Sequence, residues 1–196
     1  MKQSRAGVYL CFGAGGVVGD NRMTSYPSVR RSAIHHLLQT ARESRGEAGF
    51  LLDMKTGEQL DYQEATDESS DEITFIVDLT GASNVAVLHN HRDDTPPGAD
   101  DWQNFIHQSA FQEMVVVTPI RQYDITKPAG WKMPAGETPK LTFLRFQAML
   151  ERARRAAGHV QGFRHLPESA QHTLLRETNE QMARFCGVDM GQENIP

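Results

Sequence analysis

The chain has 196 residues, of which 39% are hydrophobic and 23% charged, which excludes collagen, a coiled coil and wholesale disorder. A chain of this length can form a domain with a substantial buried core and an extension. No apolar run approaches the roughly 18 residues of a transmembrane helix. The net charge is −5, but the acidic residues are unevenly distributed: residues 46–101 hold fourteen Asp and Glu against two Lys and Arg. We expect this segment to repel nucleic acid and to favour a cation or a basic partner.

The first predicted elements are a short buried strand at Val8–Phe12 and a helix that runs from a Ser28 cap to about Arg45. Between them lies a glycine-rich stretch, residues 13–19, with GxGxxxG spacing. Because no helix start follows it, we interpret this stretch as a turn and not as a dinucleotide site.

The middle of the chain predicts a β-rich layer. Its expected strands are Phe50–Asp53, Gln59–Tyr62, Ile73–Leu79, Asn84–Leu88, Met114–Thr118 and Gln122–Thr126. The first two form a hairpin, and the acid-rich stretch Glu64–Glu72 is interpreted as a solvated loop. A helix that begins near Asp100 or Asp101 interrupts the strands and turns apolar residues inward.

The last third of the chain is predicted to be helical. After a Pro- and Gly-containing loop, Thr138 caps a helix to about Ala157, and a final helix spans Glu168–Phe185. The order of elements predicts an α/β fold with a mixed sheet flanked by helices over residues 1–135, followed by a helical C-terminal extension over 136–196. From residue 138 on, this extension is either a solvated helical surface or a docking site for a partner or a second copy.

The chemistry-bearing segment begins with His89 and His91, two positions apart at the end of an apolar strand. Side chains alternate along a strand, so both imidazoles leave the same face and can share one ion. A catalytic zinc site takes a third protein ligand, which Asp100 or Asp101 could supply from the start of the next helix. Glu47 is then the candidate base for the metal-bound water. A His–x–His pair alone is also compatible with a purely structural role.

The ordered set resembles the JAMM, or MPN-type, zinc metalloprotease family, whose pattern is Glu, then His–x–His, seven residues, Ser, two residues and Asp. Residues 47–51 are similar to the Glu element, residues 89–91 to the histidine pair in the form of bacterial and phage members, and residues 97–101 to the closing motif. The resemblance covers residues 30–127. It implies the layering of that family, which is like that of cytidine deaminase.

The resemblance also implies a function. Zn²⁺ would be held by His89, His91 and Asp101, and Glu47 would take a proton from the zinc-bound water that attacks a peptide or isopeptide carbonyl. The implied enzyme is a metallopeptidase or isopeptidase of the cytoplasm, with secretion left open. Its substrate would be a polypeptide, for example a ubiquitin-like or basic tail, and neither nucleic acid nor a membrane is expected as a partner.

Three departures from the family pattern stand out. Arg92 replaces the usual Pro after the second histidine, the following loop is one residue shorter, and the Ser is absent. If Gly98 takes the Ser position, Asp101 is the ligand; if Pro97 takes it, Asp100 is. We favour Asp101, because an aromatic residue then occupies the apolar position that follows the ligand.

The missing Ser bears on activity, because its hydroxyl is thought to help hold the oxyanion in the family. Thr95, or a backbone N–H near Gly98, is the candidate replacement. The alternative function is a catalytically silent MPN-like module that binds a protein partner through its surface.

Overall fold

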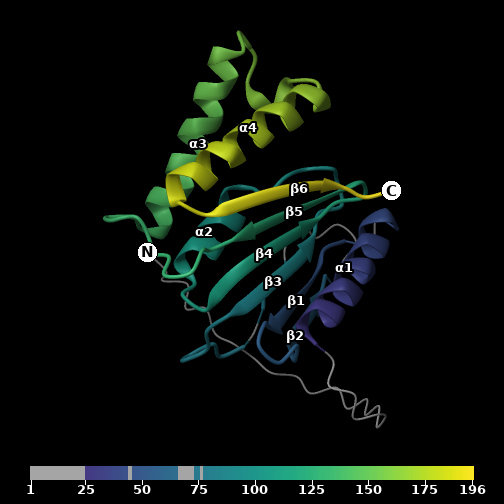
Figure 1. Ribbon diagram of the computed structural model, residues 1–196. Helices are drawn as coiled ribbons and strands as arrows, with labels where there is room; N and C mark the ends of the chain where they lie inside the picture. Colours follow the sequence, from purple (N-terminus) through teal and green to yellow (C-terminus); the bar gives the residue numbers. More distant parts are fainter. Residues whose placement is uncertain (1–24, 44–45, 66–72, 76) are drawn as a thin grey trace, which may run out of the picture.

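A computed structural model of the chain describes residues 25–43, 46–65, 73–75 and 77–196 (Figure 1). The strand expected at Val8–Phe12, the glycine turn at 13–19 and most of the acidic stretch Glu64–Glu72 lie outside these residues. The helices are α1 (Tyr26–Arg42), α2 (Ala99–His107), α3 (Pro139–Ala156) and α4 (Glu168–Cys186), with a 3₁₀ turn, η1 (Phe163–His165). The strands are β1 (Ala48–Asp53), β2 (Gln59–Glu64), β3 (Val85–Asn90), β4 (Phe111–Val117), β5 (Arg121–Thr126) and β6 (Asp189–Asn194).

The α/β class with a mixed sheet is confirmed. The six strands lie in the order β2-β1-β3-β4-β5-β6, and β3–β4 is the parallel pair in an otherwise antiparallel sheet. Helix α2 is the crossover between these two strands. The carboxyl end of β3 and the amino end of α2 therefore meet at one edge of the sheet, which is where α/β proteins place ligands.

Side chains alternate cleanly between the two faces of the sheet. Helix α1 packs on one face, and α2 lies on the other, where α3 packs on α2 and α4 on α3 (Figure 1). In β3, Ala86 and Leu88 belong to the core under α1, whereas Val85 and Val87 belong to the core under α2. This period of two directs His89 to the α2 face and Asn90 to the α1 face.

Most of the expected elements are present within a few residues of their predicted bounds. The start of α1 differs: Ser25, not Ser28, is its N-cap, because Pro27 occupies the first turn, where a missing N–H costs nothing. Thr138 caps α3 as expected, its hydroxyl accepting from the amide of Leu141 at 3.3 Å.

The strand expected at Ile73–Leu79 is wrong, since none of the described residues in this range belongs to a strand. Both edges of β1 and of β3 are already paired, so no edge of these central strands is free to accept it. The segment instead packs across β1. A Cβ on Gly49 would lie 2.7 Å from Cζ of Phe75, so this approach requires the glycine.

The strand β6 was not expected from the sequence. Its residues, DMGQEN, are mostly polar and exposed, and they lack the alternation that predicts a strand. Gly187, in the left-handed conformation with a φ of 65°, ends α4 and turns the chain back along β5. The C-terminal part of the chain is thus a helical hairpin followed by an edge strand of the main sheet.

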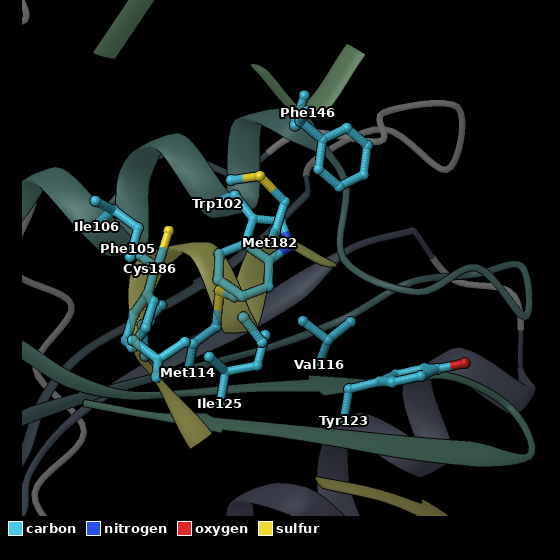
Figure 2. Packing of buried hydrophobic residues seen from close by; sticks show 14 of the residues in the cluster. Trp102, Phe105, Ile106, Met114, Val116, Tyr123, Ile125, Phe146, Met182 and Cys186 are labelled. Atoms are coloured by element: carbon cyan, nitrogen blue, oxygen red, sulfur yellow. The ribbon is translucent and has the colours of Figure 1, made fainter. Parts of the chain in front are cut away.

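Residues on both sides of position 135 share one hydrophobic core. Figure 2 shows Met182 and Cys186 of α4 and Phe146 of α3 against Trp102 of α2, above Met114 of β4. Each of these side chains is at most 4% exposed. The division into a domain over residues 1–135 and an extension over 136–196 stays a prediction. In the described part of the chain, no helix combines the length and apolarity that crossing a membrane requires.

Candidate metal centre

Three of the expected ligands converge where β3 ends and α2 begins. The Nε2 atoms of His89 and His91 are 3.2 Å apart. Oδ1 of Asp101 lies 3.1 Å from Nε2 of His89, and Oδ2 lies 3.5 Å from Nε2 of His91. Among the described residues, these three form the one group of His, Cys, Asp or Glu side chains that could hold a metal ion.

The separations suit a bound cation. Two ligand atoms placed about 2.1 Å from a tetrahedral ion are about 3.4 Å apart. The three distances in the group, from 3.1 to 3.5 Å, bracket this value. The side chains are 8%, 14% and 22% exposed for His89, His91 and Asp101, so the group is partly shielded yet reachable from solvent.

The backbone next to His91 sets the tautomer of its ring. Nδ1 lies 2.9 Å from the carbonyl oxygen of Thr95, and because a carbonyl can only accept, Nδ1 carries the hydrogen. The lone pair of Nε2 is then directed at the group, as a metal ligand requires. The Thr95 hydroxyl is also on the Nδ1 side of the ring, 3.3 Å away, opposite the atom that would bind the metal.

The first turn of α2 orients the carboxylate of Asp101. The amide of Gly98, the N-cap residue, donates to Oδ2 at 2.7 Å, and the positive end of the helix dipole favours a negative charge there. Asp100 is exposed and does not belong to the group. Of the two candidate oxyanion donors, the Gly98 amide is thus engaged with Asp101, and the Thr95 hydroxyl lies on the far side of the His91 ring.

Charge balances within the group. Burial opposes protonation of His91, but Asp101, and after it Glu47 and the Thr95 carbonyl, raise the pKa of this histidine to about 9. Although burial acts against ionisation of Asp101, His89 and His91 hold its pKa well below the usual range. Without a metal, the group therefore favours a protonated His91 beside an ionised Asp101, and a bound cation would take the place of that proton.

Glu47 lies just before β1, on the same face of the sheet as the two histidines. Gly49 pairs with His89 in the antiparallel ladder, so Glu47, two residues earlier, projects from the same side. Its side chain is half-buried, and its charge acts on His91. The expected base and the expected ligands therefore share one site.

A residue that the sequence did not single out connects these elements. Asn90, fully buried between the two histidines, points to the opposite face. Its Oδ1 accepts from the amide of Ala48 at 2.7 Å, and its Nδ2 donates to the carbonyl of Gly46 at 3.1 Å. Its only sequence signal was its place in the middle of His–x–His.

The loop between His91 and Gly98 is anchored in the sheet. Asp94 forms an ion pair with Arg121 of β5 and accepts a hydrogen bond from the Thr118 hydroxyl at 2.7 Å. Thr118 follows β4 directly, so the loop is tied to the strand ends next to the group. These contacts were also not foreseen, because they join residues 24 or more positions apart.

No protein-family model, no curated protein and no solved structure matches this chain. The assignment of the site therefore depends on the arrangement of its own residues.

Proposed function

We propose that the protein is a zinc-dependent peptidase or isopeptidase of the JAMM type. The observation that carries the proposal is the convergence of two imidazole Nε2 atoms and one carboxylate at tetrahedral separations, with Glu47 on the same face. Two histidines and a carboxylate form a ligand set used by catalytic zinc, which leaves a fourth position for a reactant.

The order of elements supports the family assignment. The acid precedes β1, the histidine pair ends β3, and Asp101 lies in the first turn of the helix that crosses to the parallel strand β4. We take this order as support for the layering that the resemblance implies. Asp101 and not Asp100 belongs to the group, which supports the favoured register with Gly98 at the position of the family's Ser.

Zinc bound here would lower the pKa of a water molecule and polarise a carbonyl group. In this proposal Glu47, on the same face of the sheet as the ligands, would accept the proton from that water and return it to the leaving amine. Asn90 fixes the backbone around Glu47, and Thr95 and Gly98 orient His91 and Asp101. The chain's own residues thus supply a base, three ligands and the contacts that hold them.

The expected substrate is a polypeptide, in particular a basic tail. Asp93 and Asp100 are exposed on the loop and helix start that border the group. Residues 46–101 carry fourteen acids against two bases, so the segment that supplies the ligands favours a positively charged partner.

A non-catalytic MPN-like module is the second candidate, and one observation favours it. The Gly98 amide donates to Asp101, and the Thr95 hydroxyl lies at Nδ1 of His91, on the side of the ring opposite the atom that would bind the metal. Loss of one oxyanion donor typically lowers a rate by about 10²–10³. We therefore expect a slow enzyme. If its rate of cleavage falls to zero, the protein is the silent module.

The test combines metal content with cleavage. Elemental analysis of purified protein is expected to find one zinc per chain, lost in Asp101→Asn and retained in its neighbour control, Asp100→Asn. Glu47→Gln is expected to keep the zinc and to abolish cleavage of isopeptide-linked and basic tail peptides.

Loss of zinc in Glu47→Gln would make Glu47 a ligand and overturn its role as a base. A zinc-loaded wild type that cleaves no member of a broad peptide library would replace the enzyme by the silent module. A wild type that binds no zinc would overturn the enzyme and its metal site and leave the silent module.

A further inference from the structure

Helix α4, in the C-terminal part of the chain, reaches the metal centre through Asn179. This side chain is fully buried. Its Oδ1 accepts from Nε1 of Trp102 at 2.7 Å, and its Nδ2 donates to the carbonyl of Pro97 at 2.9 Å. A second contact of Nδ2, with the carbonyl of Leu175 at 2.8 Å, ties the amide to its own helix.

The two partners of Asn179 bracket the segment that carries Asp101. Pro97 precedes the N-cap Gly98, and Trp102 directly follows the expected ligand. One buried amide therefore holds both ends of the first turn of α2. A shift of this turn against α4 would strain or break these buried hydrogen bonds, which opposes the shift.

A second contact from the same helix secures the start of the loop. His172 lies seven residues, or about two turns, before Asn179 and so on the same side of α4. Arg121 is the ion-pair partner of Asp94, and its Nη1 atom is 3.0 Å from Nε2 of His172. Burial, and then Arg121 and Arg176, lower the pKa of His172, so its neutral ring accepts this hydrogen bond.

We propose that α4 is a positioning element of the metal centre and that Asn179 is its positioning residue. Through Pro97 and Trp102, Asn179 sets where Asp101 lies relative to the two histidines. The affinity for zinc then depends on a helix that contributes no ligand. This inference rests on the proposed metal site but not on peptidase activity.

The test compares two neighbouring buried polar residues of α4. Asn179→Leu removes both bonds to the site segment. Thr178→Val is the matched control, because Thr178 is also fully buried but donates only within its helix, to the Leu174 carbonyl at 2.7 Å. For each full-length variant, the zinc dissociation constant is measured by competition with a chromophoric chelator, and apo-protein stability by urea unfolding.

We expect Asn179→Leu to bind zinc about tenfold or more weakly, in the range known for partners that orient metal ligands, and Thr178→Val to stay within about twofold of wild type. A merely structural role predicts that zinc affinity follows apo stability in both variants. Equal affinities in wild type and folded Asn179→Leu would overturn the inference.

Two gentler substitutions keep the test decisive if Asn179→Leu does not fold. Trp102→Phe keeps an aromatic ring in the core and removes the Nε1 donor together with part of the indole volume, and its apo stability is measured alongside. Asn179→Asp keeps the acceptor for Trp102 and loses the donor to Pro97. Each is expected to weaken zinc binding relative to Thr178→Val, and unchanged affinity in both would overturn the inference. A wild type that binds no zinc would instead show that the metal site itself is wrong.

Discussion

Asn90 holds the backbone on both sides of Glu47. Its Oδ1 accepts from the amide of Ala48 at 2.7 Å, and its Nδ2 donates to the carbonyl of Gly46 at 3.1 Å. Because strand side chains alternate, the residue between two histidines that face one way must face the other way. The middle of the His–x–His pair thus links the proposed ligands to the proposed base.

Asn90→Leu tests this link. It leaves the Ala48 amide without its side-chain acceptor, which costs about 1–3 kcal/mol, and it frees the segment around Glu47. We expect zinc content to be unchanged, exchange of the Ala48 amide to be faster, and peptide cleavage to fall about tenfold or more, since a positioned base contributes about 10²–10⁴.

The control is Thr40→Val, a buried position whose hydroxyl donates only to the His36 carbonyl of its own helix, at 3.1 Å. It should change neither Ala48 exchange nor cleavage. Equal Ala48 exchange in wild type and Asn90→Leu would contradict the prediction.

Gly98→Ser restores the residue that the family pattern has at this position. A Cβ here would meet Oδ2 of Asp101 at an ordinary 3.7 Å, and the φ of −92° suits any residue. We expect zinc content and fold to be kept, because Ser is a good N-cap, and cleavage to accelerate by up to about 10²–10³. The rates are measured with zinc-loaded protein, and Gly98→Ala serves as the control. An equal gain in both variants would exclude the hydroxyl as its cause.

Truncation after Pro134 tests whether the C-terminal part is separable. It removes β6 from the edge of β5, and it removes Phe146, Met182 and Cys186 from the shared core. Loss of one large buried side chain costs about 2–5 kcal/mol of stability. The loss of several such side chains together exceeds the usual stability of a domain. We expect an aggregated or unfolded product by circular dichroism and sedimentation. A soluble, zinc-loaded fragment would show instead that residues 1–135 fold on their own.

Lys127, which lies away from the metal centre, makes the stability of the protein depend on pH. Its Nζ donates to the Gln108 carbonyl at 3.0 Å and lies over the rings of Phe105 and Trp131. Burial lowers the pKa of this amine to about 8, below its value in the unfolded chain. Because the folded state binds this proton less tightly, the contribution of Lys127 to stability rises as the pH increases from about 8 towards 10.5.

Urea unfolding of wild type and Lys127→Met at pH 7 and pH 9 measures this effect. We expect the stability of wild type relative to Lys127→Met to increase by about 1 kcal/mol between the two pH values. The surface variant Lys132→Met should show no such change relative to wild type. A difference that is independent of pH would mean that the amine keeps its ordinary pKa in the folded protein.

Local rules were enough for a large part of the protein. The alternation of a strand placed His89 and His91 on one face, and Thr138 before Pro139 predicted the start of α3. Both follow from the geometry of a few consecutive residues. The strand expected at Ile73–Leu79 failed, because a β-prone composition does not show whether a segment pairs with a strand edge or, as here, packs across the sheet.

The tertiary structure alone decided how distant residues meet. Which of Asp100 and Asp101 turns to the histidines depends on the phase of α2, which the Trp102–Asn179 bond and the core under it set. The polar strand β6 has no local signal and forms because β5 offers it an open edge. Asn90 and Asn179 act through contacts 42 and 77 residues away in sequence, and no periodicity encodes such contacts, because they exist only once the sheet and helices have packed.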